Sequence, residues 1–183
     1  MDRKYALEQL ELRLTNKNLV KHSIAVESIM RKISEHFSDD VEKWGLAGLL
    51  HDIDYELTAN EPEKHGVRAE DILENMGADE AIIYSIKAHN DLTGIERKRK
   101  MDKALYSADP VSGLITAAAL ILPSKKLLDV TVEFLLKRMD EKTFAKGANR
   151  EQIKTCSDFG FSIEEFLKIS LQAMQGVSEE LGL

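Results

Sequence analysis

Apolar side chains recur every three or four residues along almost the whole chain, and sustained two-residue alternation is rare. This spacing is typical of amphipathic helices and not of strands that bury one face in a sheet. Residues 5–14, 18–37 and 100–122 carry the pattern most clearly. With capping and turn residues dividing such stretches, the 183 residues are predicted to form an all-α bundle of about eight or nine helices.

Two prolines set expectations about where helices begin and bend. Pro62 stands at the first position of a predicted helix that runs to Met76, because proline fits the first turn, where no N–H bond is needed. Pro110 lies inside an apolar helical stretch, where it is expected either to kink the helix or to begin a new segment. The short helix that comes before the Pro62 helix in the chain is expected to be capped by Ser38 or Asp39 and to stop near His51.

Length and charge narrow the class of protein. A chain of 183 residues can bury a hydrophobic core of its own, and no linker or repeat divides it, so residues 1–183 are predicted to be one domain. The net charge of −7 disfavours extensive nucleic-acid binding. One cysteine, Cys156, excludes an intramolecular disulfide or a cysteine-based zinc cluster. The charged start at Met1–Tyr5 shows no apolar signal segment, so a cytoplasmic protein without a membrane segment is expected.

Histidine and aspartate residues stand at places where a helical core would hold them rigidly. His51 and Asp52 end an apolar helix rich in small residues, and His22 lies one turn into another apolar helix. Asp109 follows Ser107 and Ala108 in a largely apolar helix, where a carboxylate is costly unless it is paired or bound to a metal. Imidazole and carboxylate ligands suit divalent iron, manganese, cobalt, nickel or zinc.

The order His22, His51-Asp52, Asp109 resembles the HD superfamily of metal-dependent phosphohydrolases, and the string from Gly48 to Asp54 resembles its core motif. The resemblance covers about residues 18–122 and leaves about 124–183 as a small C-terminal helical extension. The resemblance implies an HD-domain helical bundle in which these four residues hold a divalent metal ion. The candidate ions are then iron, manganese, cobalt, nickel, zinc and magnesium.

Two further histidines resemble a feature of family members that hold two metal ions. His65 and His89 lie between the His-Asp pair and Asp109, where such members carry extra histidines. The resemblance implies that they are second-metal ligands or acid/base groups. Asn90 stands where many of those members have another histidine, so the sequence leaves one or two ions per chain open.

The activity that the resemblance implies is hydrolysis of a phosphoester or phosphoanhydride, with a nucleotide as the small phosphorylated substrate and a metal-activated water as the nucleophile. A two-metal form would act on dinucleoside polyphosphates or cyclic dinucleotides, and a one-metal form on nucleoside monophosphates. Arg97, Lys98 and Lys100 closely follow His89 and are expected to attract the phosphates. The sequence leaves a homodimer open.

A rival interpretation is a non-catalytic, metal-containing HD module that acts in protein interaction or ligand sensing. Residues 149–183 would then provide a partner surface, with Leu167, Leu171 and Met174 on one helix face. A purely structural metal site needs neither His65 nor His89, so their presence favours the enzyme. An oxygenase variant of the fold would want a fuller two-iron ligand set.

Overall fold

The computed structural model describes residues 1–141 and 143–183, and the regular elements in that part of the chain are helices only. The longer α-helices are α1 Arg3–Arg13, α2 Lys17–Phe37, α3 Val41–Leu50, α5 Ala69–Asn75, α6 Glu80–Ala88, α7 Lys100–Ile121, α8 Val132–Asp140 and α10 Ile163–Gln175. The shorter elements are α4 Tyr55–Thr58, α9 Arg150–Lys154 and α11 Ser178–Leu181, with 3-10 turns η1 Pro62–Lys64, η2 Asp91–Thr93, η3 Leu127–Asp129 and η4 Thr155–Phe159. The predicted all-α bundle is confirmed.

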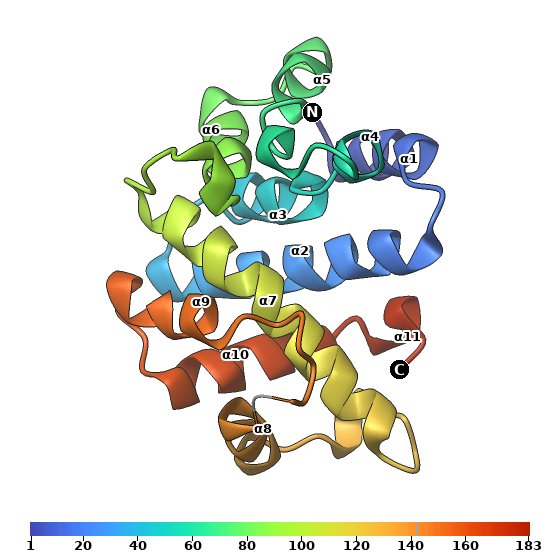
Figure 1. The fold of residues 1–183 in the computed structure, drawn as a ribbon, viewed down its shortest axis with the longest axis vertical. Helices are drawn as coiled ribbons and strands as arrows, with labels where there is room; N and C mark the ends of the chain where they lie inside the picture. The colour runs from blue at the N-terminus through green and yellow to red at the C-terminus, as the bar shows by residue number, and fades with distance from the viewer. Residues whose placement is uncertain (142) are drawn as a thin grey trace.

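Helices α2 and α7 cross at the centre of the molecule (Figure 1). Helix α3 packs along one side of α2 and α10 along the other, while α6 packs against both α3 and α7. Buried apolar side chains join these helices into a core that extends from Ala6 of α1 to Leu181 of α11. The crossing places the middle of α7 over the N-terminal half of α2 and the end of α3.

Glycine allows the closest approach between α2 and α3. A Cβ atom at Gly48 of α3 would lie 2.8 Å from the Cα of Glu27 and 2.9 Å from the carbonyl oxygen of Val26, both in the α2 backbone. Backbone atoms cannot yield as a flexible side chain can, so only glycine fits this contact. The two helices that carry His22 and lead into His51 therefore meet backbone to backbone.

The predicted helix from Pro62 to Met76 is wrong in its middle. Gly66 has a φ of +83°, a left-handed conformation, and α5 does not begin until Ala69. The backbone N–H of Gly66 donates to Asp54 Oδ2 at 2.8 Å, and a Cβ there would come within 2.8 Å of the Ile86 carbonyl oxygen. The break is thus a docking point of this segment onto the end of α6, and it brings His65 beside His89.

Pro110 lies inside one helix, α7, so the alternative in which it begins a new segment is wrong. Because proline lacks an N–H, the carbonyl of Tyr106, four residues earlier, has no helical donor. The side chain of Gln152 in α9 supplies one, with its Nε2 atom 2.8 Å from that carbonyl oxygen. The hydroxyls of Ser107 and Thr155 meet at 2.8 Å beside it. These contacts dock α9 and η4 onto α7 next to Asp109.

This pairing of Gln152 with Pro110 predicts a double-mutant effect. Gln152→Leu should lower the free energy of unfolding by about 1–2 kcal/mol, because the Tyr106 carbonyl would lose its donor. In a Pro110→Ala background the new N–H can bond that carbonyl, so the same replacement should cost less than about 0.5 kcal/mol. Urea unfolding of the four proteins measures both costs, and equal costs in the two backgrounds would contradict the pairing.

The C-terminal helix face does not form an exposed partner surface. Leu167, Leu171 and Met174 of α10 are buried in the common core, where α10 packs against α2. This part of the rival interpretation is therefore wrong, because the amphipathic face is covered by the chain itself.

Helix α7 is also long and apolar enough to cross a membrane, by length and composition alone. However, 67% of its most apolar stretch is buried inside the bundle. Its position at the centre of the core accounts for its apolar character (Figure 1).

Candidate metal centre

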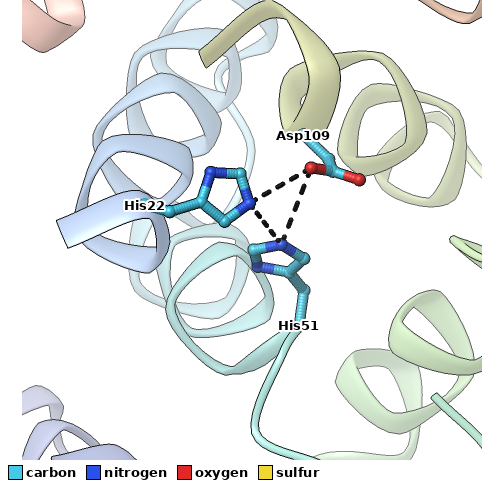
Figure 2. A group of neighbouring side chains, drawn as sticks. All are labelled: His22, His51 and Asp109. Atoms are coloured by element: carbon cyan, nitrogen blue, oxygen red, sulfur yellow. Dashed lines mark hydrogen bonds and ion pairs between the residues drawn. The ribbon is translucent and has the colours of Figure 1, made fainter. Parts of the chain in front are cut away.

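Three helices bring His22, His51 and Asp109 together at the crossing of α2 and α7 (Figure 2). The Nε2 atoms of His22 and His51 lie 3.2 Å apart. Oδ1 of Asp109 lies 3.1 Å from His22 Nε2 and 4.0 Å from His51 Nε2. Asp52, which follows His51, places Oδ1 3.4 Å from His51 Nε2 and Oδ2 3.6 Å from His22 Nε2. The four residues singled out in the sequence therefore converge on one point.

His65 and His89 lie on the other side of Asp52. Their Nε2 atoms are 3.1 Å apart, and Asp52 Oδ1 lies 3.1 Å from the first and 3.9 Å from the second. His89 ends α6 and His65 follows η1, so the break at Gly66 is what brings them together. Asp52 stands between the two groups of histidines and faces both.

The outer ring nitrogens of His51 and His89 are fixed by carbonyl groups one turn earlier in the chain. His51 Nδ1 lies 2.8 Å from the Gly48 carbonyl oxygen, and His89 Nδ1 lies 2.5 Å from that of Ile86. A carbonyl only accepts, so Nδ1 must carry the proton in each ring. In the neutral imidazole Nε2 then presents its lone pair to the cluster.

His22 and His65 are oriented in the same way by side chains. His22 Nδ1 lies 3.0 Å from Ser112 Oγ, whose own hydroxyl donates to the Asp109 carbonyl at 2.8 Å. His65 Nδ1 lies 2.9 Å from Asp54 Oδ1. Both partners act as acceptors, so the assigned tautomer again has Nδ1 protonated and Nε2 directed inward. Such partners of the outer nitrogen are the usual support of metal-binding histidines.

This arrangement fits a divalent cation. Lone pairs that face each other at 3.1–3.2 Å repel unless a proton or a cation lies between them. The carboxylates of Asp52 and Asp109 add negative charge at the same place. Nitrogen and oxygen donors in this mixture suit borderline ions from manganese to zinc. HD domains bind divalent metals, and this cluster offers the donors for one.

The protonation equilibria of the cluster favour positive charge beside Asp52. Burial opposes a charge on His65, but its hydrogen bonds to Asp52 and Asp54 outweigh burial and raise its pKa to about 10. Burial, with the charges of His51 and His65, lowers the pKa of His89 to about 4. Burial alone would raise the pKa of Asp52, yet the surrounding histidines hold it well below the usual range. A divalent cation would compete with the proton on His65.

Asp54 supports the cluster from behind His65, a role that the sequence alone does not assign to it. Its side chain is fully buried, and it contacts His65 Nδ1 with one oxygen and the Gly66 N–H with the other. In the sequence it reads as an ordinary polar residue at a helix end. Its position two residues after Asp52 is the only signal, and the partner that explains it is a loop eleven residues further on.

A cavity of about 430 Å³ opens over the cluster. Its lining residues are Leu19, His22, Asp52, Tyr55, His65, His89, Asn90, Asp91, Tyr106, Asp109 and Gln152. Asp109 is 30% exposed at this opening, so the carboxylate expected to be buried is reached from the cavity. Neither Ser112 nor Gln152 was singled out in the sequence, because each acts on a partner distant in the chain.

The cationic run expected to attract phosphates lies outside this lining. The Arg97 guanidinium stacks 3.7 Å above the Tyr106 ring and pairs with Asp91 at 3.0 Å, so it braces the cavity wall from behind. Lys98 lies over the ring of Tyr84 at 5.8 Å, and Lys100 lies over that of Phe37 at 4.2 Å. The structure thus brings Arg97 near the site and places the two lysines elsewhere.

Asn90 has a bracing role. Its Nδ2 atom donates to the backbone carbonyls of Pro62 and His65, at 2.7 and 3.1 Å, and its Oδ1 accepts from the N–H of Leu92. It therefore ties the segment that carries His65 to the end of α6.

Part of this chain is similar to known proteins. A family model of the HD domain matches residues 19–141, which extends beyond the expected 18–122 through the whole of α8. Among curated proteins, the chain is 30% identical to ribonuclease Y of Lawsonia intracellularis over 121 residues, which is 63% of this chain and 22% of that protein. It is 35% identical to ribonuclease Y of Mycoplasma mycoides over 95 residues, 52% of this chain and 22% of that one.

A third relative, ribonuclease Y of Nitratidesulfovibrio vulgaris (strain DP4), is 29% identical over 108 residues. The match covers 58% of this chain and 20% of the relative, so the chain spans about a fifth of the length of these proteins. The region that the family model matches, residues 19–141, contains all six histidine and aspartate residues of the cluster. With a helical bundle and a clustered His, His-Asp, Asp set, this protein belongs to the HD-domain family.

Proposed function

We propose that this protein is a metal-dependent phosphohydrolase that cleaves a phosphoester or phosphoanhydride of a nucleotide. The observation that carries the proposal is the convergence of four imidazole Nε2 atoms and two carboxylates at the floor of an open cavity. The HD-domain family, to which the chain belongs, is generally one of metal-dependent hydrolases. A structural metal site would not need the cavity, whereas a substrate does.

We assign different roles to the residues of the cluster according to their positions. His22, His51, Asp52 and Asp109 would hold the ion, whose chemistry is to activate water and to neutralise charge on phosphoryl oxygens. Ser112 and the Gly48 carbonyl keep the imidazoles of His22 and His51 in the required orientation. His65 would either hold a proton for the leaving oxygen or serve as a ligand.

The distances support a two-ion version of the site. Asp52 is within reach of the first histidine pair through both oxygens and of His65 and His89 through Oδ1. It could therefore be shared between one donor set with His22, His51 and Asp109 and another with His65 and His89. Asn90, in place of a further histidine, is engaged with backbone carbonyls and would not add a ligand.

Charge favours a small substrate over a long nucleic acid. The chain carries a net charge of −7, and the described lining of the cavity contains no lysine or arginine. Proteins that bind long nucleic acids depend on many such contacts with phosphates. Ribonuclease Y, as its name states, is a ribonuclease, but the similarity covers about a fifth of it. We therefore propose a free nucleotide as the substrate.

The test is reconstitution of the metal-free protein. After chelation it should regain phosphate-releasing activity with at least one of Mn²⁺, Fe²⁺, Co²⁺, Ni²⁺, Zn²⁺ or Mg²⁺. The assay panel should hold nucleoside mono-, di- and triphosphates, a dinucleoside polyphosphate and a cyclic dinucleotide. Elemental analysis of the same samples gives the number of ions per chain.

Two outcomes separate this proposal from the rival. If chelation abolishes turnover, the metal serves catalysis. If the reloaded protein binds metal but releases no phosphate from any substrate, and chelation only lowers the melting temperature, the non-catalytic HD module is the better interpretation.

A further inference from the structure

A second cavity adjoins the metal centre. It has a volume of about 520 Å³ and shares one wall, His22, with the cavity over the cluster. Its lining residues are Asn18, Lys21 and His22 of α2, Gly113, Thr116, Ala117 and Leu120 of α7, and Leu181 to Leu183 at and after the end of α11. The two cavities therefore meet at His22, so a molecule whose phosphate lies at the cluster has this groove on the other side of that ring.

Gly113 leaves the groove open but lowers the stability of helix α7. It lies in the interior of α7, where glycine is less favourable than alanine. At Gly45 and Gly48 an added Cβ would strike Arg31 or the backbone of Glu27, but at Gly113 it would meet no atom within 4 Å. Packing therefore does not require glycine at this position. Open space beside His22 is what the missing side chain provides.

The polar groups of the groove differ from those of the metal cavity. The cavity over the cluster has three carboxylates and no lysine or arginine in its described lining. The groove instead contains Lys21, together with Asn18 and Thr116 as hydrogen-bonding groups. Ala117 and Leu120 add apolar surface to the lining. A few polar groups on an apolar wall are typical of sites for uncharged organic groups.

We propose that this groove binds the leaving group of the substrate, and that this group is a nucleoside. The base would lie on the small-residue surface of Gly113 and Ala117, and Asn18, Lys21 and Thr116 would meet its polar atoms. The inference rests on the proposed function, because it places the scissile phosphate at the cluster beside His22. It assigns substrate choice to groove residues that are separate from the lining of the metal cavity except at His22.

The first experiment fills the groove step by step. Gly113→Ala, Gly113→Leu and Gly113→Phe should progressively lower the ratio of kcat/KM for adenosine monophosphate to that for glycerol phosphate, by at least tenfold in the phenylalanine variant. Glycerol phosphate carries no base to place in the groove. The melting temperature should not fall, since alanine and leucine are better helix formers than glycine. Lys168→Phe, at an exposed position of α10, is the matched control and should leave the ratio unchanged.

The second experiment does not depend on hydrolysis. Calorimetric titration of the metal-free protein with adenosine, which carries no phosphate, should show binding to the wild type and at least tenfold weaker binding to Gly113→Phe. An unchanged ratio in the first experiment, or equal adenosine binding by both proteins, would overturn the proposal. If no phosphate substrate is turned over but adenosine binding still depends on position 113, the proposed function fails and the nucleoside groove stands.

Discussion

Replacing Asp52 with asparagine should lower kcat on the order of 1,000-fold and remove tightly bound metal. A metal ion supplies several kcal/mol of transition-state stabilisation, and Asp52 is the carboxylate that faces all four inward-pointing imidazoles. Asparagine keeps the size of the side chain and removes its charge. Steady-state kinetics and elemental analysis of the purified variant provide the two measurements.

The matched control is Asp129→Asn, which changes the same groups at an exposed position in η3. It should leave both kcat and metal content at the wild-type value. An Asp52→Asn protein that kept its metal and turned over at the wild-type rate would show that the chemistry lies elsewhere.

Replacing Gly48 with alanine should lower the free energy of unfolding by about 3 kcal/mol and the melting temperature by roughly 6–12 °C. The added Cβ would lie 2.8–2.9 Å from α2 backbone atoms, so the two helices would have to separate. Because His22 stands on α2 and His51 follows α3, the separation should also weaken metal binding. Thermal unfolding of the metal-free variant and metal titration test the two effects separately.

The same substitution at Gly113 is the internal control for this prediction. There the added Cβ meets nothing within 4 Å, so Gly113→Ala should raise the melting temperature through helix propensity alone. If both alanine variants shifted stability in the same direction, the close backbone contact at Gly48 would not be what determines the result.

Much of the helical framework could be predicted because its signals are local. Asn16, Asp79 and Asn149 cap α2, α6 and α9, each accepting from an N–H two residues later, as short polar side chains before an apolar pattern indicate. The cap of α3 is Asp40, whereas Ser38 or Asp39 was expected. Ser38 instead ends α2 in a left-handed conformation, so a cluster of three capping residues served two helix ends.

The break at Gly66 could not be read from the sequence. Glu61, Pro62 and Glu63 form a good helix start, and Gly66 is a local residue that disfavours its continuation only weakly. The helix breaks because the Gly66 N–H donates to Asp54 and because the Ile86 carbonyl lies too close for a Cβ at position 66. Both contacts come from segments distant in the chain. Tertiary packing here overrides helix propensity.

In the candidate site, too, some residues could be predicted from the sequence and others depend on tertiary contacts. His22, His51, Asp52 and Asp109 were found because their order resembles a known family, and the structure brings them together. The residues that orient them were not found. Ser112 and Asp54 are common polar residues whose role depends on which ring nitrogen they meet, and that is fixed only by the packing of α2, α4 and α7.

The contact between Gln152 and α7 has a consequence for how such a protein can diverge. The six residues of the cluster all lie within residues 19–141, whereas Gln152, which lines the same cavity, comes from the segment after it. One residue of the cavity wall thus comes from a stretch of chain that carries none of the cluster residues. Substitutions in α9 can therefore reshape the cavity wall without altering any side chain of the cluster, so the wall and the cluster can diverge independently.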